Sequence, residues 1–114
     1  MFSKPLVAAS LEPLMLSLLS EGEMYGYQII QRVKELSDGQ IVWNASKLYP
    51  LLHKLENKGL VKAHWEMATG GGLNRKYYRL TPKGKAMLET HQREWRNYNA
   101  ILVQLWGPQL LPSE

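Results

Sequence analysis

Residues 44–59 hold the pattern that most constrains how this chain can fold. Four leucines there recur at the i, i+3, i+4 and i+7 positions of a helix: Leu48, Leu51, Leu52 and Leu55. This spacing places them in one apolar stripe that faces a core. Asn44 or Ser46 can cap the start of the helix, and Gly59 supplies the left-handed residue that ends it. Pro50 lacks a backbone donor and therefore favours a start near Ser46.

The opposite face of this helix is polar and cationic, with Ser46, Lys47, Tyr49 and His53. By itself, that composition fits an ordinary solvated surface helix equally well. The residues that follow favour a DNA-binding helix over an ordinary surface helix. Residues 60–66 and 75–80 are two short β-type runs around a glycine-rich tip. A helix followed at once by a β-hairpin is typical of a winged helix-turn-helix, whose helix enters the major groove of DNA.

Alternation in the second run of the hairpin separates two faces. Arg75, Tyr77 and Arg79 alternate with Lys76, Tyr78 and Leu80. One face can therefore pack a tyrosine and a leucine while the other presents cations. The glycine triplet at 70–72 precedes no Gly-Lys-Ser/Thr and opens no helix, so a nucleotide-binding loop is disfavoured.

Composition limits the classes of function. The chain has 114 residues, a net charge of +4 and no cysteine, which fits one basic domain in a reducing compartment. It carries neither a membrane span nor a signal peptide, so we expect a cytoplasmic protein with no membrane partner. His53, His64 and His91 lie on different predicted elements. We therefore expect no metal site, no cofactor and no enzymatic activity.

The first part of the chain predicts two helices. Residues 1–9 are expected to be loose, and a first helix begins at a Ser10 cap and ends at Gly22. A second helix covers about 24–36, and Gly26 on it indicates close approach of another helix. Residues 41–43 are expected to form a third short strand beside the hairpin.

Thr81 and Pro82 are a start signal for a last helix that reaches about residue 106, roughly 37 Å long. Residues at alternating spacings of three and four form a seam on it: Leu88, His91, Trp95, Tyr98, Leu102 and Leu105. The seam can pack on its own domain, but the helix outreaches that domain, which favours a partner helix. We therefore expect a DNA-binding domain at 1–81 and a dimerisation helix and tail at 82–114. Two-fold pairing would let two Trp95 rings stack on each other or on a planar aromatic ligand.

Several of these segments together resemble the PadR family of bacterial transcriptional regulators. The matching residues are Tyr25-Gly26-Tyr27, Leu48-Tyr49-Pro50-Leu51-Leu52, Leu55-Glu56, Gly59-Leu60, Arg75-Lys76-Tyr77-Tyr78-Arg79-Leu80-Thr81 and Gly84. The resemblance implies a homodimeric winged-helix repressor of the short subfamily, which has a single C-terminal helix. Some members bind flat aromatic drugs at the dimer centre through a tryptophan at a place comparable to Trp95. At the wing, Leu73-Asn74 stands where relatives often carry proline or arginine.

The expected fold is α+β and mostly α, a winged helix-turn-helix with a long C-terminal dimerisation helix. The expected function is a homodimeric, sequence-specific transcriptional repressor that binds double-stranded DNA and is relieved by a planar aromatic effector. The expected DNA-contacting residues are Ser46, Lys47, Tyr49, His53, Arg75 and Lys76. The alternative is a winged-helix protein interaction module that binds no DNA, and the salt dependence of duplex binding separates the two.

Overall fold

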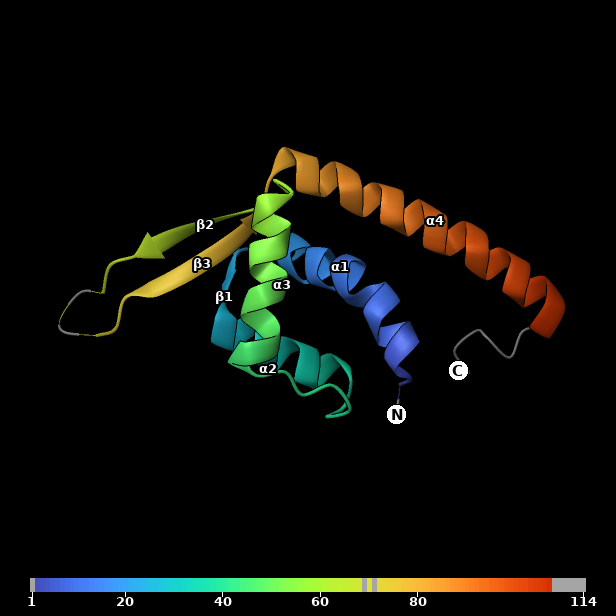
Figure 1. The fold of residues 1–114 in the computed structure, drawn as a ribbon, viewed down its shortest axis with the longest axis horizontal. Coiled ribbons are helices and arrows are strands. Elements are labelled where there is room, and N and C mark those ends of the chain that lie inside the picture. The colour runs from blue at the N-terminus through green and yellow to red at the C-terminus, as the bar shows by residue number, and fades with distance from the viewer. Residues whose placement is uncertain (1, 69, 71, 108–114) are drawn as a thin grey trace.

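The computed structural model describes residues 2–68, 70 and 72–107. In chain order the elements are α1 (Lys4–Ser20), β1 (Met24–Tyr25), α2 (Gly26–Leu36), α3 (Ala45–Asn57), β2 (Val61–Glu66), β3 (Arg75–Leu80) and α4 (Pro82–Trp106). The first three helices form a compact body, the β2–β3 hairpin projects from it, and α4 extends away in the other direction (Figure 1). This is the expected winged helix-turn-helix followed by a long helix.

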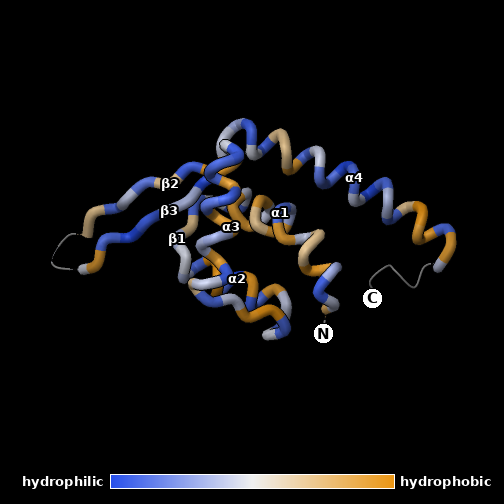
Figure 2. Tube along the Cα trace, in the orientation of Figure 1, coloured by the Kyte–Doolittle hydropathy of each residue, from blue (hydrophilic) through white to orange (hydrophobic). Residues whose placement is uncertain are grey.

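The core lies where α1, α2 and α3 meet the base of the hairpin. Its most deeply buried side chains are Met15, Leu16, Leu18, Ile29, Val33, Leu48, Leu52, Leu55, Leu60 and Tyr78. Three of the four leucines predicted to face the core are therefore fully buried, and Leu51 packs partly buried against them. Along α4, hydrophobic residues return at the end far from this body (Figure 2).

The start of α3 is fixed by Asn44. Its Oδ1 accepts hydrogen bonds from the Lys47 amide at 3.1 Å and from the Ser46 hydroxyl at 2.7 Å, so Asn44 is the cap. Pro50 consequently lies inside the helix, beyond its first turn. Because proline has no N–H, the Ser46 carbonyl lacks the helical donor that residue 50 would otherwise supply. Gly59 follows the helix with a φ of 77°, as predicted.

Two expectations for the first part of the chain were wrong. Helix α1 begins at Lys4, because Ser3 caps it and Pro5 lies in the first turn, where no backbone donor is needed. Residues 2–9 are thus mostly helical rather than loose. The third strand is β1, which pairs antiparallel with β3, and the sheet order is β1-β3-β2. Residues 41–43 form no strand, and Trp43 instead packs into the core with 7% of its surface exposed.

Candidate nucleic-acid interface

The polar face of α3 is open to solvent along its length. Ser46, Lys47 and His53 are exposed, and Tyr49 keeps 37% of its surface accessible. The Tyr49 and His53 rings lie 6.4 Å apart between centroids, so the two aromatic side chains are neighbours on this face. Within the described part of the chain, the Lys47 ammonium has no carboxylate in ion-pair range. It is available for an external anion.

Helix α2 lies directly against this face at one point. A Cβ at Gly26 would be 2.6 Å from the Tyr49 hydroxyl oxygen and 3.4 Å from a methyl carbon of Leu48. The close approach predicted for Gly26 is confirmed, and its neighbour is α3. The helices α2 and α3 therefore form the packed pair of a helix-turn-helix, with the polar side of α3 outward.

The two predicted wing cations point to opposite faces of β3. The Arg75 guanidinium carbon lies 4.6 Å from the centroid of the Tyr25 ring, whereas the Lys76 Nζ lies 5.5 Å from the centroid of Tyr78. Adjacent strand residues alternate in direction, so a single flat surface cannot meet both side chains. A groove that encloses the hairpin can.

Tyr25 supports the candidate interface from β1, although the sequence placed it only in a stretch that resembles PadR regulators. Its ring meets Tyr77 edge to face at 5.3 Å, and Tyr77 stacks on His64 at 5.8 Å. This aromatic row runs across all three strands and supports the Arg75 side chain from β1. The position of Tyr25 follows from the pairing of β1 with β3. These strands are distant in the sequence, so no local pattern indicated the contact.

Three large apolar side chains are exposed near the tip of the hairpin. Exposed fractions are 63% for Trp65, 72% for Met67 and 86% for Leu73. The Asn74 side chain accepts a hydrogen bond from the Ala68 amide at 3.0 Å and holds the two arms together. Leu73 therefore adds exposed apolar surface near the tip, while Asn74 serves the contact between the arms.

The histidines stay apart on α3, β2 and α4, as their positions in the sequence predicted. His64 does approach two carboxylates, with its Nε2 3.7 Å from Glu23 and 3.6 Å from Glu66. Both carboxylates are exposed, and such groupings are common on surfaces that hold no metal. We assign no ion to them.

The predicted seam on α4 divides into two parts. Leu88 is buried in the core, and the His91 Nε2 lies 2.5 Å from a carboxylate oxygen of Glu12 on α1. These two residues face their own domain, because the first half of α4 packs along α1. The exposed fractions of Trp95, Tyr98 and Leu105 are 42%, 64% and 75%, and Leu102 is half-buried.

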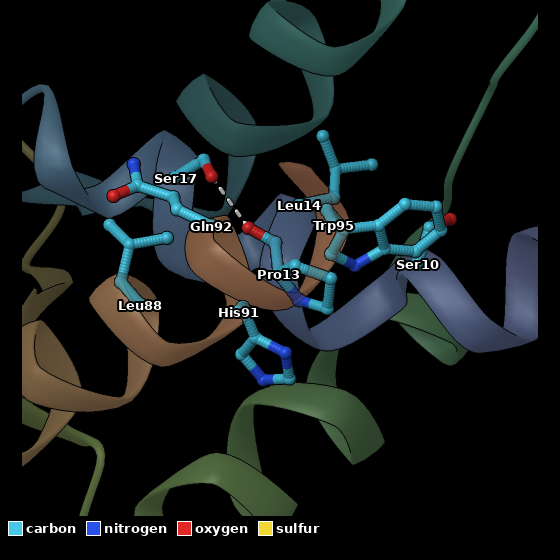
Figure 3. Close-up of a pocket in the computed structure, with 8 residues that line it drawn as sticks. All are labelled: Ser10, Pro13, Leu14, Ser17, Leu88, His91, Gln92 and Trp95. Carbon is cyan, nitrogen blue, oxygen red and sulfur yellow. Dashed lines mark hydrogen bonds between the residues drawn. The ribbon is translucent and has the colours of Figure 1, made fainter. Parts of the chain in front are cut away.

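Trp95 stands at the boundary between the two parts. It lines a groove between α1 and α4, where its ring lies beside Ser10 and Leu14 (Figure 3). Trp95 also lines two neighbouring hollows, one with Leu6 and Trp43 and the other with Leu6 and Tyr98. None of the described helices is long and apolar enough to cross a bilayer.

A small helical body with an exposed, cationic third helix, a β-hairpin wing and a long final helix defines a winged helix-turn-helix DNA-binding regulator. Comparison with known proteins agrees. The profile of the transcriptional regulator PadR-like family matches residues 15–90, which are 76 of the 114 residues. The chain belongs to this family, and it is accordingly a transcriptional regulator rather than an enzyme.

Solved structures show the same architecture. A transcriptional regulator from Clostridium thermocellum superimposes with a TM-score of 0.80 and 28% identity, covering 91% of this chain and 97% of that one. A PadR family transcription regulator from Clostridium difficile gives a TM-score of 0.76 and 32% identity, covering 86% and 99%. An uncharacterized protein of Lysinibacillus sphaericus is 30% identical, covering 90% of this chain and 93% of the relative.

Proposed function

We propose that the chain works as a homodimeric repressor in which two copies of α3 enter successive major grooves of one operator. Ser46, Lys47, Tyr49 and His53 would meet bases or phosphates, and Arg75 and Lys76 would hold phosphates beside them. The observation that carries this proposal is the solvent-open polar face of α3, whose Lys47 has no internal carboxylate partner in the described chain. Phosphate contacts would supply most of the affinity.

Dimerisation is proposed to run through the outer half of α4, so that residues 1–81 bind DNA and residues 82–114 join the copies. Large apolar side chains stay exposed there in one chain: Trp95, Tyr98, Ile101, Leu105 and Trp106. Phe2, which precedes α1, and Leu6 on α1 add exposed apolar surface, each with 46% accessible. A second copy that covers these side chains would remove a large apolar area from water.

An effector is proposed to be planar and aromatic and to stack on Trp95. The groove beside that ring is lined mainly by apolar groups, and the ring itself is 42% exposed. Such a ligand would weaken DNA binding only if it favours one arrangement of the dimer over the other.

Duplex binding by wild type and two single variants tests the DNA half of the proposal. A DNase footprint beside the chain's own gene would locate the operator, and fluorescence anisotropy would then compare wild type, Lys47→Ala and Arg93→Ala. Loss of a base-edge contact at Lys47 is expected to cost about 1 to 3 kcal/mol. Arg93→Ala removes the same charge from α4 and is expected to retain wild-type affinity. Equal affinities for all three proteins would remove Lys47 from the interface.

Solution mass and tryptophan fluorescence test the other half. A dimer at micromolar concentration is expected, and planar aromatic cations should quench wild type more than Trp95→Ala. A monomer would end the dimer proposal, and identical quenching in both proteins would end the ligand proposal.

A protein interaction module without DNA binding is the second candidate. The apolar tip formed by Trp65, Met67 and Leu73 favours it, because exposed apolar side chains suit a protein surface. This candidate predicts that duplex binding is negligible at every salt concentration.

A further inference from the structure

The C-terminal end of α3 is held by the first turn of α4. The Thr81 hydroxyl donates to the Gly59 carbonyl at 2.7 Å, and the Lys83 ammonium donates to the Lys58 carbonyl at 2.9 Å. A Cβ at Gly84 would lie only 2.0 Å from the Leu60 carbonyl oxygen, so the two backbones are in direct contact. The end of α3 and the start of α4 therefore form one rigid joint.

Glu12 on α1 extends this joint to the middle of α4. One carboxylate oxygen accepts from the Lys58 Nζ at 2.6 Å, and the other lies 2.5 Å from the His91 Nε2. The His91 ring points toward α3 (Figure 3). A single carboxylate on a third helix thus bridges the end of α3 and the middle of α4. Its two partners, Lys58 and His91, lie 46 and 79 positions away from it in the sequence.

The environment of Glu12 favours the charged form that this bridge needs. Burial acts to raise the pKa of Glu12, but hydrogen bonds from Lys58 and His91 outweigh burial and hold the pKa below its usual value. Only 19% of the Glu12 side chain is exposed, so water competes weakly for the carboxylate. The bridge is therefore more restrictive than an ion pair at an open surface.

We infer that Glu12 is a positioning residue for operator binding, which sets the angle between α3 and α4 without touching DNA. The inference rests on the proposed function, in which α4 joins the copies and α3 enters the groove. A tilt of about 5° over the roughly 37 Å of α4 displaces its far end by about 3 Å. That displacement is close to the rise of one base pair, about 3.4 Å, so it changes the register of two half-sites.

Spin labels measure this angle without DNA. The chain has no native cysteine, so Ser46→Cys and Gln104→Cys place labels on the start of α3 and the outer part of α4. Electron paramagnetic resonance distances would be recorded in the full chain, diluted with unlabelled wild type so that each dimer carries one labelled copy. Glu12→Ala is expected to shift or broaden the distance by about 3 Å.

Two further variants complete the distance experiment. Lys58→Met removes the ion pair between Lys58 and Glu12 and keeps the contact between Glu12 and His91. The Lys58 side chain is half-exposed, so this variant tests the joint even if Glu12→Ala fails to fold. Glu21→Gln is the matched control, because it weakens an ion pair from the residue that caps the end of α1 to Arg32 on α2 and leaves the joint intact. The control is expected to match wild type. The inference would be overturned if the distances in Lys58→Met superimposed on those of wild type. The same result for a folded Glu12→Ala would also overturn it.

Operators of different spacing supply the functional measurement. Glu12→Ala is expected to bind the full operator roughly two- to thirty-fold more weakly and to lose discrimination against spacers changed by one base pair. Its affinity for a single half-site should equal that of wild type. An equal loss on the half-site would mean that Glu12 supports the fold of α3 itself. A wild type that binds no duplex would end the proposed function, while the spin-label distances would still decide whether Glu12 fixes the angle.

Discussion

The Tyr49 hydroxyl oxygen on α3 lies 2.6 Å from the point where a Cβ at Gly26 on α2 would stand. The tyrosine expected on the DNA face is thus also the residue that closes the space between the two helices. Its ring remains 37% exposed, so the packing leaves part of the side chain accessible for the proposed DNA contact. A glycine on one helix and a phenol on the next therefore set how the proposed DNA face of α3 is presented.

Gly26→Ala is expected to displace the Tyr49 ring and leave the fold intact. The atom in the way is the end of a partly exposed side chain, which can turn outward, and Gly26 has no positive φ that alanine would disfavour. Thermal unfolding should therefore change by a few degrees at most. Operator affinity should fall as far as in Tyr49→Ala. Wild-type affinity in Gly26→Ala would show that the position of this ring does not matter for DNA.

Arg75→Ala and Lys76→Ala are each expected to lower the slope of log affinity against log salt by about 0.9. The side chains project to opposite faces of β3. A similar reduction of the slope in both variants would therefore indicate that the hairpin lies within a groove. A change in only one variant would indicate that one face of the wing meets DNA. If both variants keep the wild-type slope, neither side chain contacts the DNA phosphate backbone.

Tyr78→Phe is expected to stabilise the fold. The ring is completely buried, and its hydroxyl has no hydrogen-bond partner in the described chain. Burial, together with the nearby Glu56 and Tyr49, raises the pKa of Tyr78 to about 12, so the group stays neutral. An unsatisfied buried hydroxyl costs about 1 to 3 kcal/mol, which phenylalanine recovers. Urea unfolding measures the difference, and a clear loss of stability would reveal a partner for the hydroxyl.

Stability contributed by the Glu12 bridge should disappear in acid. The folded-state pKa of Glu12 is lowered from 4.5, so the unfolded chain binds this proton first as the pH falls. The contribution is fully present above 4.5 and is lost as the pH drops through the folded value. Urea unfolding from pH 7 to pH 3 should show wild type more stable than Glu12→Gln near neutrality, with the gap closing in acid. If the difference in stability between wild type and Glu12→Gln stays constant with pH, the packing of the side chain and not its charge is responsible.

Local patterns predicted the elements whose signals lie within a few residues. The helix at α3, the two strands of the hairpin and the Thr81 start of α4 followed from leucine spacing, alternation and a cap with proline. Helix α1 carries two start signals in tandem, at Ser3 and at Ser10, and the first of them begins the helix. The strand β1 depends on Tyr25 meeting Tyr77, a pairing that no local pattern contains.

The candidate site divides in the same way. Periodicity predicted that Lys47 and His53 face outward, because exposure follows helical phase. Glu12 was missed because its partners are distant in sequence, and a lone carboxylate within an apolar stripe was the available signal. His91 was assigned to the dimer seam by its spacing on α4, which does not distinguish an intermolecular face from one that packs on α1.

The contact beneath Gly84 also bears on how such regulators diverge. Any side chain at this position meets the Leu60 carbonyl oxygen at 2.0 Å, and a backbone oxygen cannot swing aside as a side chain does. A descendant that replaces this glycine must let α4 depart from the body along another line, and its operator would need a different spacer in step with the protein. In the proposed dimer, this one glycine therefore ties the direction of α4 to the operator spacing that two copies can meet.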